Sequence, residues 1–65
     1  MNIQLNGERR QIGAQDLAAA LEELGLAGAV VATAVNGEFV PADARRATPL
    51  TEGDALEVLS PMQGG

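Results

Sequence analysis

A single amphipathic helix is the feature that most limits how this chain of 65 residues can fold. Its apolar side chains recur at i, i+3, i+4 and i+7 and form one stripe, made of Leu17, Ala20, Leu21 and Leu24. Asp16 can cap the first turn by accepting a backbone N–H, and Gly25 can take the left-handed conformation that ends a helix. A chain of this length forms one domain. The stripe must therefore be buried against the other residues, and one face of a β-sheet suits it.

The segments on either side of the helix carry strand patterns. Residues 2–5 alternate between apolar and polar side chains, and Asn6-Gly7 favours a type I′ turn, so residues 2–12 are predicted to form a β-hairpin. Residues 29–35 are apolar on both faces and rich in β-branched side chains, which predicts a buried central strand.

The last third of the chain is predicted to contain two more strands. Residues 38–40 are a short strand that ends at Pro41, a residue suited to a sheet edge. Residues 42–50 are irregular, with one helical turn. A turn at 52–54 then leads into a final strand at 55–59, where apolar and polar residues alternate.

Together these elements predict an α+β roll in which a mixed sheet of four to five strands packs on one main helix. Residues 1–60 are expected to form this single domain, and residues 61–65 a flexible C-terminal tail that ends in Gly-Gly. The predicted core comprises Ile3, Leu5, Ile12, Leu17, Leu21, Leu24, Val31, Val35, Leu56 and Val58.

The charge of the chain narrows the classes of partner. Nine acidic residues oppose four basic ones, which gives a net charge of −5 at pH 7. A nucleic acid is therefore an unfavourable ligand, and a partner with a positive surface is favoured. No apolar run approaches the ~20 residues of a membrane span, and the first residues lack the pattern of a secretory signal. We expect a cytoplasmic protein with no nucleic-acid or membrane partner.

The side chains that usually carry catalysis are missing, because the sequence has no His, Cys, Lys, Tyr or Trp. Glu22 and Glu23 are adjacent, so they diverge on a helix and cannot share a metal ion. Ser60 has no histidine or lysine to activate it. We therefore predict that the protein is not an enzyme and has no catalytic side chain, no metal site and no bound cofactor.

The sequence does not decide the roles of several residues that can lie on the surface. The basic residues form two pairs, Arg9-Arg10 and Arg45-Arg46. These pairs are either plain surface charges or contacts to the acidic rim of a partner. Phe39, the only aromatic residue, is either part of the core or an exposed anchor, and Val40 and Leu59 can join an exposed apolar patch that marks a docking face.

Gly64 and Gly65 differ from the other glycines, because no predicted turn or helix cap requires them. Two residues without Cβ make a thin end that can enter a narrow cleft, and the terminal carboxylate is ionised at neutral pH. A carboxylate is a poor electrophile, but another protein can convert it to an acyl-adenylate, which a sulfur nucleophile then attacks to form a thiocarboxylate. Gly65 is therefore the predicted attachment site, and Gly64 and Gly65 are predicted to thread into partner active sites.

Four stretches of the sequence together resemble the thiamine-biosynthesis sulfur carrier (ThiS) family, whose members have a ubiquitin-like β-grasp fold. They are MNIQLNGE, DLAAALEELGL, VATAVNGEFVP and LTEGDALEVLSPMQGG, and they span essentially the whole chain. The resemblance implies that an ATP-dependent adenylyltransferase, related to ubiquitin-activating enzymes, adenylates Gly65. Sulfur from cysteine, delivered by a desulfurase, then replaces AMP, and the thiocarboxylate donates its sulfur to thiazole synthase. The family's partners are implied to face the sheet side away from the helix.

Two alternatives share part of this pattern. The small subunit of molybdopterin synthase and the carriers of cysteine synthesis resemble the chain in fold and tail, although they are usually longer. The second alternative is a β-grasp binding module without sulfur chemistry, which would share the fold but would not use the Gly-Gly end. The acidic surface and the free Gly-Gly end count against that module.

Overall fold

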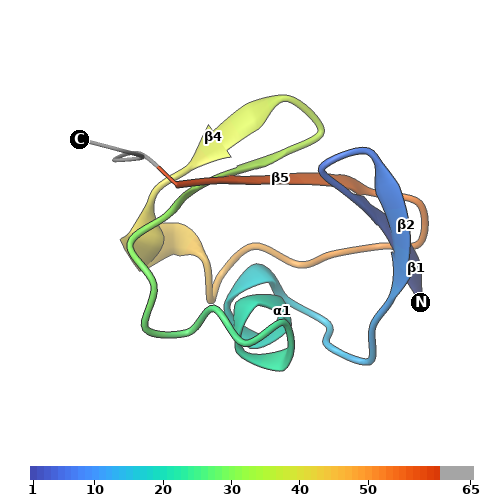
Figure 1. Ribbon diagram of the computed structural model, residues 1–65, viewed down its shortest axis with the longest axis horizontal. Coiled ribbons are helices and arrows are strands. Elements are labelled where there is room, and N and C mark those ends of the chain that lie inside the picture. The colour runs from blue at the N-terminus through green and yellow to red at the C-terminus, as the bar shows by residue number, and fades with distance from the viewer. Residues whose placement is uncertain (61–65) are drawn as a thin grey trace.

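The computed structural model describes residues 1–60, and within them five strands form one sheet that covers a single α-helix (Figure 1). The elements in chain order are β1 (Asn2–Leu5), β2 (Glu8–Gln11), α1 (Leu17–Glu23), β3 (Ala32–Val35), β4 (Glu38–Val40), the 3₁₀ turn η1 (Ala42–Ala44) and β5 (Ala55–Leu59). The strand order in the sheet is β2-β1-β5-β3-β4. The predicted α+β roll with a mixed sheet is confirmed, since β5 runs parallel to β1 and antiparallel to β3.

Two Asn-Gly turns close the two hairpins. In the β1–β2 turn Asn6 and Gly7 have φ angles of 50° and 86°, and in the β3–β4 turn Asn36 and Gly37 have 51° and 86°. Positive φ at both central residues is the requirement of a type I′ turn, and Asn followed by Gly meets it at low steric cost. The predicted hairpin at residues 2–12 is therefore confirmed, with its second strand ending at Gln11.

The prediction of a central strand at residues 29–35 is confirmed in position, because β3 lies inside the sheet between β5 and β4. It is wrong in extent, because β3 begins only at Ala32. Residues 27–30 instead connect α1 to β3 along the surface, and the side chain of Val30 is 81% exposed. The short apolar run did not distinguish a buried strand from a surface connection, because no polar residue marks where the connection ends.

The helix α1 has the ends that the sequence predicts. The Asp16 carboxylate accepts a hydrogen bond from the backbone N–H of Ala19 at 2.8 Å, and Gly25 has a φ of 81° just after the helix. The exposed Glu23 carboxylate accepts hydrogen bonds from the backbone N–H groups of Gly13 and Ala14, at 3.0 Å each. The last turn of α1 is thereby tied to the segment that enters it.

The core lies between α1 and the inner face of the sheet. Its buried hydrophobic residues are Ile3, Ile12, Leu17, Ala20, Leu21, Val40, Leu50 and Leu56. Four more residues of the predicted core are partly buried and pack against this cluster: Leu5, Leu24, Val35 and Val58. Val31, also predicted as core, is half-buried and lies outside the cluster, because it precedes β3.

Leu50 is a core residue that the sequence pattern missed. Its backbone N–H donates to the carbonyl of Gln15 at 2.9 Å, and the backbone N–H of Leu17 donates to the carbonyl of Thr48 at 2.9 Å. These two bonds fasten an irregular segment beside the start of α1 and turn Leu50 into the core. The spacing of apolar residues could not predict that Leu50 is buried, because its neighbours belong to neither a helix nor a strand.

Replacing Leu21 by Ala should lower the free energy of unfolding by about 2–5 kcal/mol, since it leaves a cavity against the sheet. A domain of this size holds only about 3–5 kcal/mol in total, so the variant is expected to be largely unfolded at room temperature. Urea denaturation followed by circular dichroism measures this. The matched control is Val30→Ala, which removes an exposed apolar side chain and should leave the midpoint unchanged. A Leu21→Ala protein as stable as this control would contradict the assigned core.

Candidate functional site

The face of the sheet away from α1 is set by the strand register. Residues directly opposite each other on neighbouring strands point to the same face. Ala34 lies opposite both Phe39 of β4 and Glu57 of β5, and Ala32 lies opposite Leu59. These five side chains therefore share the outer face, while Thr33, Val40 and Val58, which are also mutually paired, point toward the core.

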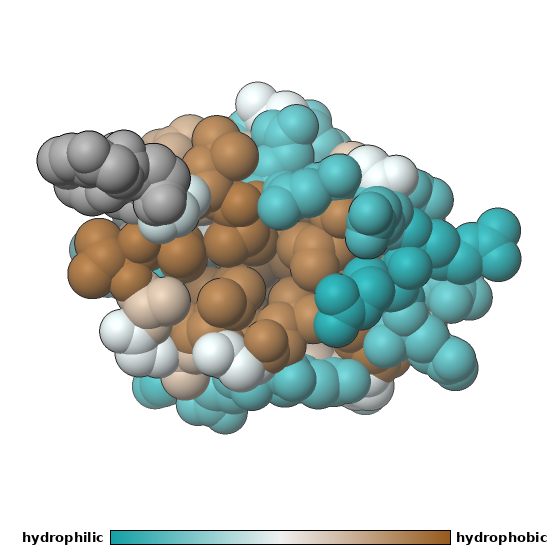
Figure 2. Space-filling model, in the orientation of Figure 1, coloured by the Kyte–Doolittle hydropathy of each residue, from teal (hydrophilic) through white to brown (hydrophobic). Residues whose placement is uncertain are grey.

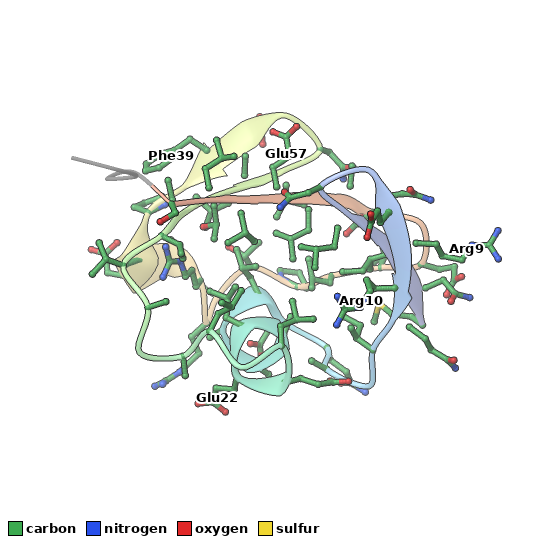
Figure 3. The ribbon with its side chains drawn as sticks, in the orientation of Figure 1. Arg9, Arg10, Glu22, Phe39 and Glu57 are labelled. Carbon is green, nitrogen blue, oxygen red and sulfur yellow. The ribbon has the colours of Figure 1, made fainter. Side chains whose placement is uncertain are left out.

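An apolar surface, which we call the outer patch, occupies this face over β3, β4 and β5. It consists of Ala32, Ala34, Phe39 and Leu59, and Glu57 borders it. Phe39 is 69% exposed and Leu59 is 62% exposed, because the alanines between them are too small to cover either side chain. Figure 3 shows Phe39 and Glu57 on the side of the sheet opposite to Glu22 of α1.

The outer patch decides two questions that the sequence left open. Phe39 is an exposed residue and not a core residue, and Leu59 is exposed as expected. The expectation for Val40 is wrong, because this side chain is 8% exposed and belongs to the core. Alternation within β4 explains both outcomes: once Val40 faces α1, Phe39 must face outward.

The outer patch lies at the end of β5, where the described part of the chain stops. Leu59 is the last residue of β5, and Ser60 is the last residue that the structure describes. The predicted attachment site Gly65 and the threading residues Gly64 and Gly65 lie outside the described residues. Figure 2 shows polar residues over the end that carries the β1–β2 hairpin, whereas hydrophobic residues gather toward the end of β5.

The two arginine pairs differ in what their side chains contact. The Arg45 guanidinium donates from Nη2 to the carbonyl of Val31 at 2.7 Å and from Nε to the Thr33 hydroxyl at 3.1 Å. That buried hydroxyl donates in turn to the carbonyl of Val40 at 2.8 Å. Arg45 is therefore a structural residue that ties η1 to β3, a role that the sequence did not indicate. Arg46 is exposed.

The other pair, on β2, is divided between the two faces of the sheet. Arg9 lies opposite Gln4 on the outer face, and Arg10 lies opposite Ile3 on the face of α1. In Figure 3 Arg9 projects away from the molecule and Arg10 points back toward it. The two charges therefore do not form one basic patch.

A shallow cavity of about 200 Å³ lies on the helix side of the molecule. It is lined by Ala18, Leu21, Glu22, Ala27, Ala42, Arg45 and Arg46. The lining combines a carboxylate with two guanidinium groups, one of which is already engaged by Val31 and Thr33. Among residues 1–60, no group of three or more His, Cys, Asp or Glu side chains could hold a metal ion, and no helix is long and apolar enough to span a membrane.

The carboxylate of Asp54, just before β5, accepts several hydrogen bonds. The backbone N–H of Thr51 donates to the Asp54 carboxylate at 2.8 Å, and the Asn36 amide donates to it at 3.1 Å. The Thr51 bond, followed by the Asn36 bond, lowers the pKa of this carboxyl below its ordinary value. Asp54 therefore stays ionised at neutral pH and closes the turn before β5, at the opposite end of the strand from the outer patch.

The arrangement defines a small protein of the ubiquitin-like β-grasp class, with an apolar sheet face beside the end of the last strand. The sequence profile of the ThiS family matches residues 3–65. The chain therefore belongs to the ThiS family. The match includes both terminal glycines.

Solved structures agree with this assignment. The crystal structure of a thiamine biosynthesis protein (ThiS) from Geobacter metallireducens is similar, with 36% sequence identity, a TM-score of 0.84 and full coverage of both chains. A solution structure of a thiamine biosynthesis protein from Geobacter metallireducens is 35% identical, with a TM-score of 0.79. The alignment with it covers all of this chain and 88% of the other. A search of curated protein sequences found no match.

Replacing Arg45 by Met should lower the free energy of unfolding by about 1–2 kcal/mol, because the Val31 carbonyl and the Thr33 hydroxyl each lose a charged donor. The neighbouring variant Arg46→Met removes the same charge from an exposed position and should stay within about 0.5 kcal/mol of the parent. Paired urea titrations measure both. Equal effects of the two substitutions would show that Arg45 acts only through its charge.

Proposed function

We propose that this protein is the sulfur carrier of thiazole formation in thiamine biosynthesis, and that Gly65 carries the sulfur. The observation that carries the proposal is the match of residues 3–65 to the ThiS family, which extends to the two C-terminal glycines. The related structures from Geobacter metallireducens, both of thiamine biosynthesis proteins, favour this pathway over molybdopterin or cysteine synthesis.

The chemistry takes place at the end of the main chain. A carboxylate oxygen of Gly65 bonds to the α-phosphorus of ATP, and pyrophosphate leaves. A hydrosulfide ion that carries the sulfur of cysteine then attacks the carbonyl carbon of the adenylate. The bond between this carbon and the phosphate oxygen breaks, AMP leaves, and the thiocarboxylate remains. Thiazole synthase takes the sulfur from this group.

The protein acts as a co-substrate in this scheme and not as an enzyme. ATP is bound by the partner adenylyltransferase, a relative of ubiquitin-activating enzymes, and a desulfurase supplies the sulfur. The absence of His, Cys and Lys from the whole sequence fits this role, since the partners provide the acid, base and nucleophile. The proposed compartment is the cytoplasm, where these soluble partners would act.

We propose that the outer patch is the surface on which the partner enzymes dock. Exposed Phe39 and Leu59 supply apolar area next to the end of β5, so a docked partner has the chain end within reach. Aromatic residues, Phe among them, are enriched at protein–protein interfaces relative to the rest of the surface. The net charge of −5 favours a partner whose docking surface is framed by basic residues.

Incubation with the adenylyltransferase of the same organism, ATP and a sulfide source should replace one carboxylate oxygen of Gly65 by sulfur. Intact-protein mass spectrometry measures the mass difference, and fragmentation locates it at the last residue. The control lacks Gly65, should keep the circular dichroism spectrum of the parent and should gain no sulfur. Sulfur on any other residue, or an unmodified parent protein, would refute the proposed carrier role.

Replacing Phe39 by Ser should raise the KM of the adenylyltransferase for this protein by about tenfold, since an anchor of the docking surface is lost. Stability should change little, because Phe39 is exposed. Pyrophosphate release as a function of carrier concentration measures KM. The matched control is Val30→Ser, which replaces an even more exposed apolar residue outside the outer patch and should keep the parent KM. A higher KM in both variants, or in neither, would rule out the outer patch as the docking surface.

A further inference from the structure

The side chain of Asn6 takes the place of a strand beside the second half of β5. The parallel ladder between β1 and β5 contains only two pairs, Gln4 with Ala55 and Leu5 with Leu56. Beyond it, the backbone N–H of Asn6 donates to the carbonyl of Leu56 at 2.9 Å. The chain then turns away into the β1–β2 turn, so the backbone of β1 provides no partner for Val58.

The Asn6 amide supplies the missing partner. Its Oδ1 accepts a hydrogen bond from the backbone N–H of Val58 at 2.9 Å, and its Nδ2 donates to the carbonyl of Val58 at 3.1 Å. A primary amide offers one acceptor and two donors, so it can bond both groups of a single residue as a neighbouring strand would. Beyond Leu56, β5 is therefore held on both sides: by β3 through Thr33 and Ala32, and by Asn6.

This contact spans 52 residues of sequence and lies two positions before Ser60. The β1–β2 turn constrains the same residue, because Asn6 has a φ of 50°. Asparagine tolerates this conformation far better than most side chains. One residue thus shapes the turn and bonds the strand that leads to the chain end.

We propose that Asn6 is a positioning residue for sulfur loading: by bonding Val58 it holds the last residues of β5 in the sheet, and so sets where the chain end leaves the outer patch. This inference rests on the proposed carrier function. A strand end that is not held must be ordered each time a partner takes up the terminal glycines, and ordering a backbone has an entropic cost. Asn6 would remove part of that cost before docking.

The chain contains its own matched control in Asn36. This residue occupies the same position in the β3–β4 turn, with a φ of 51°. Its Oδ1 accepts from the backbone N–H of Ala55 at 3.0 Å, and its Nδ2 donates to Asp54 at 3.1 Å. Asn36 therefore holds the beginning of β5, whereas Asn6 holds its end.

Asn6→Gly and Asn36→Gly in the full chain form the test. Glycine accepts positive φ, so both turns are kept and only the amide is lost. Amide hydrogen exchange measured by NMR should become at least roughly tenfold faster at Val58 in Asn6→Gly. In Asn36→Gly the faster exchange should appear at Ala55 instead. Unchanged exchange at Val58 in Asn6→Gly would overturn the structural half of the inference.

Steady-state kinetics with the adenylyltransferase test the functional half. In Asn6→Gly the outer patch is intact, so KM should stay within about twofold of the parent, while kcat falls roughly threefold to tenfold because the chain end is placed less well. Asn36→Gly should keep both constants. A merely structural role would affect the two variants alike, and equal kcat values for them would overturn the inference.

The two possible failures remain separate. If the parent protein is not adenylated, the proposed function and the functional half of the inference fall together, and the exchange at Val58 still decides whether Asn6 holds β5. If the parent is adenylated normally and Asn6→Gly keeps the kcat of Asn36→Gly, the carrier function stands and the positioning role of Asn6 is wrong.

Discussion

Strand β5 lies between two hairpins that are not neighbours in the sheet, and its pairing with both is the interaction on which the rest of the structure depends. It bonds β1 in parallel and β3 in antiparallel fashion. Without it, the β1–β2 and β3–β4 hairpins would be separate two-stranded ribbons, which are marginal in water. Because β5 is the last element within residues 1–60, the sheet and the core beneath it are completed only late in the described part of the chain.

In this topology the residues that stabilise the fold and the residues proposed to bind partners lie on opposite faces of the sheet. The inner face of the sheet buries Ile3 and Leu56 against α1, and Arg45, the residue that follows η1, bonds Val31 and Thr33 and so holds β3. The outer face carries Phe39 and Leu59, which the core does not need. A partner can therefore use the outer patch without competing with the packing that keeps so small a domain folded.

The same topology explains how a protein with so few reactive side chains can take part in group transfer. In the function we propose, the reacting carbon belongs to the main chain, and the domain has only to present it. β5 lies in the middle of the sheet and is bonded on both sides, so the residues after it follow a strand that is held by two neighbours. A chain end that followed an edge strand would lack half of these bonds.

Several local elements could be predicted from the amino-acid sequence alone. The stripe from Leu17 to Leu24 with its Asp16 cap, the two Asn-Gly turns and the alternation of β5 all appear where the residues predict them, because each depends on neighbours in the chain. The family resemblance was also visible in the sequence, and the profile match bears it out. The Gly64 and Gly65 assignments stay predictions, since these residues lie outside the described part.

Four features became known only from the folded protein. They are the place of β5 in the middle of the sheet, the outward face of Phe39, the structural role of Arg45 and the bond between Asn6 and Val58. A pattern of period two says that Phe39 and Val40 point in opposite directions, but not which of them meets α1. Likewise, an asparagine that suits a turn gives no sign of a partner 52 residues away. These features depend on how strands remote in sequence are brought into register, and that is settled by packing the whole sheet on one helix, not by any local preference.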